Sequence, residues 1–202
     1  RAAEEARDEA IRLNPASAES WAGRGTVRMN WGAYVQGTGA DPAPYFEKAE
    51  ADFAAALERN PRHLDARKDR AILYSNRGVH VLRQGGDPAA DFARAVAEYD
   101  AALEIDPADP ELWCLRAGVR HNAGNFVQSS GGAPAEHYRA ADADYAKALE
   151  LNPELASAWH ARGRLRMHEA MWLEDRKEDP TAAYRASIAA ILTRRSLCSR
   201  AF

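Results

Sequence analysis

The sequence predicts an all-α chain of stacked antiparallel helix hairpins, an α-solenoid. Apolar and small residues recur at helical spacings, one pattern repeats with a fixed period, and helix-start and helix-stop residues mark each repeat. The clearest mark is a proline that recurs every 46 residues. It ends the segments AIRLNP, ALERNP, ALEIDP and ALELNP, at Pro15, Pro61, Pro107 and Pro153.

Each repeat carries residue columns for two helices. A tryptophan follows the proline by six residues, with Arg67 as the exception, and a small residue comes four positions later. The second half carries an alanine, an aromatic and another alanine before the next proline. The columns are Trp21, Trp113 and Trp159; Gly25, Ala71, Ala117 and Gly163; Ala49, Ala95 and Ala141; Phe53, Tyr99 and Tyr145; Ala56, Ala102 and Ala148.

These columns resemble the tetratricopeptide repeat family. In that family a Trp and a small residue mark helix A, and an Ala, an aromatic, a second Ala and a terminal Pro mark helix B. The resemblance covers almost the whole chain and implies a right-handed superhelix of hairpins. The chain departs from the family in length, because the usual repeat has about 34 residues. The additional residues all fall between the small residue of helix A and the first alanine of helix B.

The additional residues are expected to lengthen both helices at the end of the hairpin away from the proline joints. Asp-Pro or Ala-Pro pairs recur there, and Asp before Pro starts a helix. Glycines recur inside helix A, which favours close approach of helix B over a kink or an early helix end. Glycine-rich segments then turn the chain, so each unit is a hairpin of two helices of about 18 residues. The pairs lie at 41–42, 87–88, 133–134 and 179–180, and the glycines are Gly32, Gly78 and Gly124.

The period divides residues 1–202 into a single array. Residues 1–15 form helix B of a partial repeat, and four repeats follow. The last is atypical, because Ile191 stands where the aromatic belongs and Arg194 and Arg195 replace Ala and Leu. A polar capping helix is the ordinary interpretation of such a terminus. The alternatives are that the tail SLCSRAF is an altered end or that it docks on another chain. The repeats span 16–61, 62–107, 108–153 and 154–202.

Composition limits the classes of partner. The chain has 27 basic and 30 acidic residues without a long run of either sign, which argues against nucleic acid or membrane as a partner. There is no run of ~20 apolar residues and no signal peptide. Cys114 and Cys198 fit no metal or redox spacing, so free thiols in the cytoplasm are expected. Because the chain opens on Arg1 inside a helical pattern, we expect a processed product or a piece of a longer protein.

The sequence contains no catalytic motif, so we expect a non-enzyme without cofactor or metal. No glycine-rich phosphate loop precedes Lys-Ser or Lys-Thr, and no serine lies in a nucleophile elbow. Cys114, His121, His160 and His168 fall on helix A of adjacent repeats, but none are spaced i, i+4 like helical zinc ligands. We interpret them as polar groove residues. The carboxylates of helix B, among them Glu98, Asp142 and Asp144, are interpreted as solvent-exposed.

The resemblance also implies which positions face a ligand, because helix A lines the concave groove of such superhelices. One of these columns reads Asn, Asn, Asn, His, and an amide offers both donors and an acceptor. We predict a ladder that clamps the backbone of an extended peptide. The alternative is that these Asn residues bond between adjacent repeats or simply reflect duplication. The ladder is Asn30, Asn76, Asn122 and His168, and the other predicted peptide-binding residues are Lys68, His121, His160 and Arg164.

The predicted function is a non-catalytic protein-interaction scaffold that holds a peptide or partner segment in this groove. Two alternatives stay open. One is a recognition or regulatory array of a larger enzyme, and the other is a self-association module that forms homo-oligomers through its open ends.

Overall fold

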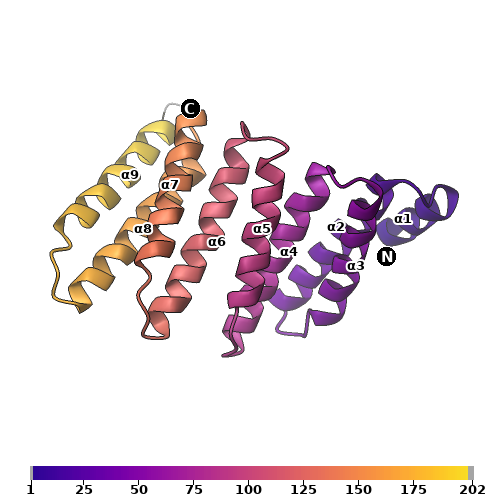
Figure 1. Ribbon diagram of the computed structural model, residues 1–202, viewed down its shortest axis with the longest axis horizontal. Coiled ribbons are helices and arrows are strands. Elements are labelled where there is room, and N and C mark those ends of the chain that lie inside the picture. Colours follow the sequence, from indigo (N-terminus) through magenta and orange to yellow (C-terminus); the bar gives the residue numbers. More distant parts are fainter. Residues whose placement is uncertain (1, 200–202) are drawn as a thin grey trace. The chain divides into compact units, whose positions relative to one another are not determined.

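The computed structural model describes the backbone of residues 2–199 and the side chains of residues 3–193. Every regular element in that part is an α-helix (Figure 1). The chain divides into two compact units, Arg1–Asp106 and Pro107–Phe202. The first contains α1 (Ala2–Leu13), α2 (Ala18–Gly37), α3 (Ala43–Arg59), α4 (Leu64–Arg83) and α5 (Ala89–Leu103). The second contains α6 (Pro110–Ser129), α7 (Ala135–Leu151), α8 (Ala156–Asp175) and α9 (Thr181–Ser199).

The helices pair into antiparallel hairpins within each unit. In the first unit α2 pairs with α3 and α4 with α5, and in the second α6 pairs with α7 and α8 with α9 (Figure 1). Successive hairpins stack, because α4 packs on both α2 and α3, and α8 packs on both α6 and α7. We call α2, α4, α6 and α8 helix A, and their partners helix B. The prediction of stacked antiparallel hairpins is therefore confirmed within each unit.

Both helices are long, as the repeat length predicts. Each helix A has 20 residues, and α3 and α7 have 17. The predicted Asp-Pro start of helix B is present in the hydrogen bonds: the Asp41 carboxylate accepts the Ala43 N–H at 3.0 Å, and Pro42 already has helical φ and ψ. The same bond recurs at Asp87 and Asp179. The side chain therefore satisfies a backbone donor that a helix start leaves free.

The turn between helix A and helix B depends on one residue with positive φ. Gly39, Gly85 and Gly131 have φ of 84°, 78° and 80°. Lys177 occupies the corresponding place in the last hairpin with φ of 60°. Because a Cβ atom disfavours this region by about 1–2 kcal/mol, the last turn is the strained one.

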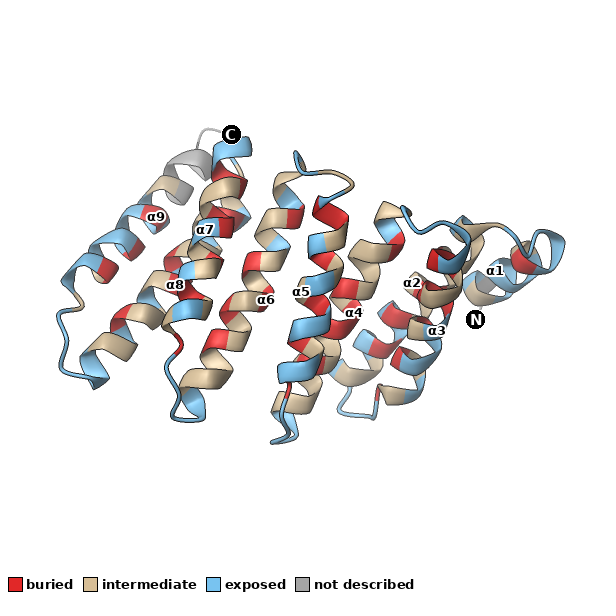
Figure 2. Ribbon diagram, viewed as in Figure 1, coloured by how far each residue is buried: buried red, intermediate tan, exposed pale blue. Residues whose placement is uncertain are grey.

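The glycine column inside helix A lets helix B approach closely. A Cβ atom at Gly32 would lie 2.6 Å from the Phe46 ring, and one at Gly124 would lie 2.6 Å from the Tyr138 ring. Gly78 meets Phe92 in the same way. Helix A continues through each of these glycines, so close approach is confirmed over an early helix end. Figure 2 shows the buried residues on the sides of the helices that face their neighbours.

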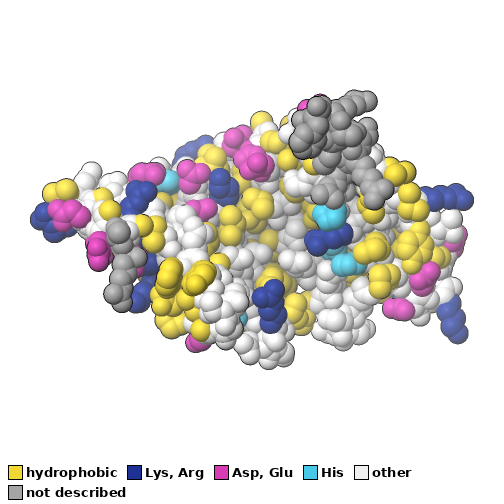
Figure 3. Space-filling view, turned by 180° about the vertical axis from the view of Figure 1, so that it is seen from behind, with side chains coloured by type: hydrophobic (Ala, Val, Ile, Leu, Met, Phe, Trp, Pro, Cys, Tyr) yellow, Lys and Arg dark blue, Asp and Glu magenta, His cyan; other side chains and the backbone are white. Residues whose placement is uncertain are grey.

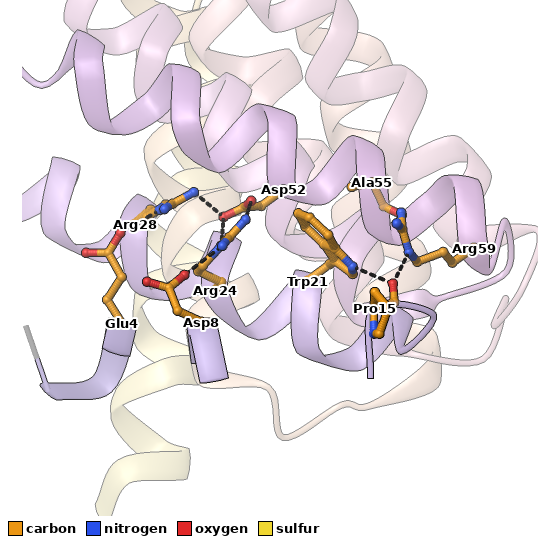
Figure 4. Close-up of polar contacts among 9 residues, drawn as sticks. All are labelled: Glu4, Asp8, Pro15, Trp21, Arg24, Arg28, Asp52, Ala55 and Arg59. Carbon is orange, nitrogen blue, oxygen red and sulfur yellow. Dashed lines mark hydrogen bonds and ion pairs between the residues drawn. The ribbon is translucent and has the colours of Figure 1, made fainter. Parts of the chain in front are cut away.

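The joint before helix A is held by one recurring hydrogen bond. The indole N–H of Trp21 donates to the Pro15 carbonyl at 3.0 Å (Figure 4). Trp113 and Trp159 donate to the equivalent proline carbonyls at 2.9 and 2.8 Å. Arg67, the exception in this column, donates from Nε to the Pro61 carbonyl at 3.0 Å. The joint therefore requires an N–H donor of the right reach, and an arginine supplies it as well as a tryptophan.

Candidate functional site

The predicted Asn column lies on the outside of helix A. Asn30 is exposed on α2, while Asn76 on α4 and Asn122 on α6 are half-buried. None of the three amides makes a hydrogen bond within the part of the chain that the structure describes. In the first unit, Asn30 and Asn76 therefore do not bond to each other across adjacent hairpins. Their donors and acceptors are free for solvent or for a ligand.

The polar groups between helix A and helix B contrast with this column, because they are paired. In the first unit the buried Asp52 of α3 accepts from Arg24 at 2.7 and 3.0 Å and from Arg28 at 2.8 Å (Figure 4). The same two arginines reach back to α1, where Arg24 pairs with Asp8 and Arg28 with Glu4. One pair of arginines thus ties a hairpin to the helix before it.

The second unit repeats this arrangement. Asp144 of α7 is 3% exposed and accepts from Arg116 at 2.6 Å and from Arg120 at 2.7 Å. The expectation that Asp144 faces solvent is wrong, because the ion pairs hold it inside the hairpin. Glu98 and Asp142 are also largely covered. Glu98 pairs with Arg67 and Arg70, and Asp142 pairs with Arg162 and Arg166.

The first unit has a polar cleft between α2 and α4, with a volume of about 330 Å³. Lys68, one of the predicted peptide-binding residues, lines it and lies 3.5 Å from the Asp65 carboxylate. Deeper in the cleft, the Thr26 hydroxyl donates to Asp69 at 2.6 Å. Burial raises the pKa of Asp69, against the opposing effect of the Thr26 hydrogen bond. Glu19, Arg7 and His63 also line the cleft, so it carries both acidic and basic groups.

The second unit has a histidine pair between α6 and α8. His121 on α6 and His168 on α8 approach to 3.0 Å between Nε2 and Nδ1, and the same Nδ1 lies 3.0 Å from Asn125 Oδ1. The Tyr138 hydroxyl lies 2.8 Å from Asn125 Oδ1 and 2.6 Å from Gln128 Oε1. These five side chains link α6, α7 and α8 in one network.

Both histidines are held neutral by their surroundings. Burial, together with charge repulsion from His168 and Arg164, lowers the pKa of His121 to about 3. Burial, with Arg164 again, also lowers the pKa of His168. His121 is 1% exposed, so it differs from the expectation that it contacts a peptide. It lies behind His168 and supports it.

Beside this network, a cleft opens between the last turns of α6 and α8, with a volume of about 510 Å³. We call it the α6–α8 cleft. It lies at the end of the hairpins away from the proline joints. It is lined by Asn125, Gln128, Ser129, His168, Met171 and Asp175.

The outside of α8 carries the remaining predicted residues. His160, Arg164 and His168 are spaced four residues apart on this helix, with the first two exposed. Figure 3 shows histidine and basic side chains gathered on this face of the molecule. Arg164 has no ion pair within the described residues. Cys114 is half-buried, and burial raises the pKa of its thiol.

No three His, Cys, Asp or Glu side chains come close enough to hold a metal ion in the part of the chain with described side chains. Over the same part, no helix is both long and apolar enough to cross a membrane. The tail SLCSRAF, with Cys198, and the pair Arg194 and Arg195 lie outside the residues whose side chains are described.

Sequence reasoning missed Asn125, Gln128 and Tyr138. The repeat columns did contain a signal for Asn125. Its column reads Ala33, Val79, Asn125 and Met171, so a polar residue appears in one repeat alone. Such a break marks a feature that the shared fold does not need.

Comparison with solved structures agrees with this architecture. The crystal structure of MamA aligns with a TM-score of 0.57 and 12% identity, over 98% of this chain and 87% of that one. A MamA RS-1 ArsTM double mutant aligns with a TM-score of 0.63 and 17% identity, over 97% and 85%. The chain has a tetratricopeptide-type fold. No protein-family model matches its sequence, and neither does any curated protein.

Proposed function

We propose that this chain is a protein-interaction scaffold whose helix A faces bind an extended peptide segment of a partner. The hairpins are the binding repeats, with the bounds 16–61, 62–107, 108–153 and 154–202. The observation that carries the proposal is the contrast in hydrogen bonding. The charged groups between the helices are paired, whereas the amides of Asn30, Asn76 and Asn122 on the outside are not.

An amide column suits an extended peptide for a simple reason. Each peptide unit presents one N–H donor and one C=O acceptor, and an Asn side chain offers two donors and an acceptor. Hydrogen bonds from the Asn amides would contact the backbone of the bound peptide and not its side chains. Other residues must therefore supply selectivity for the peptide sequence. Lys68 in the first unit, and His160, Arg164 and His168 in the second, are placed to do so.

The test is affinity capture with the full chain followed by mass spectrometry, and then a binding assay with the captured partner. Replacement of Asn30, Asn76 and Asn122 by Ala should weaken binding about tenfold or more, since each hydrogen bond contributes about 0.5–1.5 kcal/mol. Gln84→Ala is the matched control, because it removes an exposed amide outside the column. Full binding by the triple variant, together with a loss of thermal stability, would show that the column is structural.

A second function, self-association, is favoured by the surface of α9. Ile188, Ile191 and Leu192 are 58%, 40% and 56% exposed at the i, i+3, i+4 spacing of one helix face. This is not the polar face that a capping helix needs. In α7 the residue in the column of Ile188 is Asp142, which receives two arginines of the next helix A. We infer that the α9 face accepts another helix, either from a second copy or from further chain.

Light scattering at several concentrations separates self-association from peptide binding. If the α9 face pairs two copies, Ile188→Glu with Leu192→Glu should abolish the dimer and leave partner binding unchanged. A chain that stays monomeric at all concentrations would exclude this second function.

A further inference from the structure

The α6–α8 cleft has an electronegative lining. It lies where α6 and α8 both end, and the C-terminal end of a helix carries partial negative charge from the aligned peptide dipoles. Neither helix has a basic residue in its last turn. By contrast, α4 of the first unit has His80 and Arg83 there. The charge of the two helix ends in the second unit is therefore not compensated from within the helices.

A carboxylate adds to this potential. Asp175, the last residue of α8, is exposed and has no ion pair within the described residues. The nearby Arg176 is engaged elsewhere, because its Nε donates to Glu178 at 2.6 Å and its guanidinium lies over Trp172. Asp175 is thus available to an incoming cation.

The hydrogen-bond network limits which atoms can face the cleft. The Tyr138 hydroxyl has one proton but lies within hydrogen-bond distance of two amides, so one amide must present its NH₂ group. One assignment that satisfies the network turns the Gln128 amide, so that Tyr138 donates to Asn125 Oδ1 and the Gln128 NH₂ group donates to Tyr138. His168 then donates from Nδ1 to both Asn125 and His121, a three-centre bond of a common kind. This assignment leaves Gln128 Oε1 and His168 Nε2 as free acceptors.

The remaining lining fits a long side chain. The Ser129 hydroxyl donates to the Phe126 carbonyl at 2.9 Å, so its lone pairs are free to accept. Met171 is 50% exposed and offers an apolar wall. The cleft therefore combines one apolar side with several acceptors and a carboxylate, and its one histidine is neutral.

We propose that the α6–α8 cleft binds a lysine side chain of the partner peptide, with its methylene stem along Met171 and its ammonium group among Asp175, Gln128, Ser129 and His168. An ammonium group has three donors and no acceptor, which complements a lining of acceptors. The acceptors come from two helices rather than from one plane, so they suit a compact ammonium better than a flat guanidinium. This inference rests on the proposed peptide-binding function and names the side chain that the second unit selects.

The test needs no identified partner. The ¹⁵N-labelled full chain is titrated with Nα-acetyl-lysine N-methylamide, and the side-chain NH₂ signals of Asn125 and Gln128 are followed by NMR. Nα-acetyl-norleucine N-methylamide is the matched probe, because it keeps the stem and lacks the charge. The lysine probe should move both signals and bind about tenfold more tightly than the norleucine probe. Equal affinity of the two probes, or no binding of the lysine probe, would overturn the proposal.

Two variants distinguish a specific role of the Asp175 carboxylate from a general effect of negative charge on binding. Asp175→Asn should weaken binding of the lysine probe about tenfold. Glu111→Gln is the matched control, because it removes an equally exposed negative charge from the first turn of α6, at the other end of the helix, and it should leave binding unchanged. Unchanged binding by Asp175→Asn, or an equal loss in both variants, would contradict the assignment.

Failure here and failure of the proposed function are distinguishable. If the peptide-binding function holds but the cleft does not select lysine, the captured partner binds, the Asn variants weaken it, and Asp175→Asn has no effect. If the cleft binds the lysine probe and the Asn variants leave partner binding unchanged, the cleft assignment stands and the backbone ladder is excluded.

Discussion

The α6/α7 and α8/α9 hairpins of the second unit follow one pattern and differ at a few interior positions. In the first of them Gly124 allows the Tyr138 ring to be 1% exposed. In the second, Ala170 stands in the glycine position and Tyr184 is only half-buried, with its hydroxyl bonded to Glu174. The hairpin with the additional methyl group, at Ala170, is thus also the one in which the aromatic ring, that of Tyr184, stays partly exposed to solvent.

The ion pairs of the two hairpins differ as well. Asp144 lies between Arg116 and Arg120 in α6/α7, but the corresponding residue of α9 is Ala190. Arg162 and Arg166 of α8 instead pair with Asp142 of α7. Among the residues whose side chains are described, no ion pair joins α8 to α9. We therefore expect this hairpin to open before α6/α7 does.

The largest expected effect comes from the buried carboxylate. Asp144→Ala should lower the free energy of unfolding by about 3–5 kcal/mol, because it leaves two arginines without their buried partner. Asp142→Ala should cost clearly less, since its carboxylate is more exposed and water can replace it. Urea unfolding measures both. Equal losses would show that the two carboxylates have the same role and would remove the distinction between the hairpins.

The glycine column gives the next largest effect. Gly124→Ala should destabilise the second unit by up to about 3 kcal/mol, because the new methyl group overlaps the Tyr138 ring. Gly37→Ala is the matched control, because no atom lies within 4 Å of a Cβ at that position. Thermal unfolding should show a lower midpoint for the first variant alone. A small effect at Gly124 would mean that the ring moves aside as Tyr184 does.

The histidine pair predicts a pH dependence. The pKa of His121 is about 3 in the folded state, against an ordinary value of 6.5, so the unfolded chain binds more protons. Stability should therefore fall as pH decreases through 6.5, by roughly 2 kcal/mol between pH 7 and pH 5. Urea unfolding at several pH values tests this. His121→Leu should flatten the dependence, whereas replacement of the exposed His160 by Gln should keep it.

The smallest effect is expected at the turn of the last hairpin. Lys177→Gly should stabilise α8/α9 by about 1 kcal/mol, because glycine adopts the positive φ without a Cβ penalty. The reverse change in the other hairpin, Gly131→Ala, should cost a similar amount. Thermal unfolding of both variants gives the comparison. No gain from Lys177→Gly would show that the lysine is not strained there.

Much of the fold could be predicted because its marks depend on local geometry and recur. The proline joints, the Asp-Pro starts and the glycine that receives an aromatic ring each need a particular residue at a particular place. Arg67 shows the limit of this reasoning. It breaks the tryptophan column in the sequence, yet its Nε–H makes the same hydrogen bond, to the Pro61 carbonyl. Residue types aligned by the repeat period do not show which atoms make a contact.

The candidate site was harder to predict for a related reason. Asp144 and Glu98 alternate with exposed residues along helix B, and the sequence does not show that arginines from helix A reach them. The resemblance predicts that His121 faces a ligand, but its neighbour His168 covers it. Contacts between helices decide burial at such positions, and a single sequence contains no record of those contacts.

The hydrogen bond from Trp21 or its equivalent to the preceding proline has a consequence for how such hairpins grow. It lies at the end of each hairpin where the proline joints are, so an extension at the opposite end leaves it in place. About six additional residues in each helix raise the opposite end by about 9 Å. The added helical turns change neither the proline joint nor the residue that donates to it. The α6–α8 cleft lies among these added turns. Such hairpins can acquire a new pocket by extension while the contacts that stack them stay as they were.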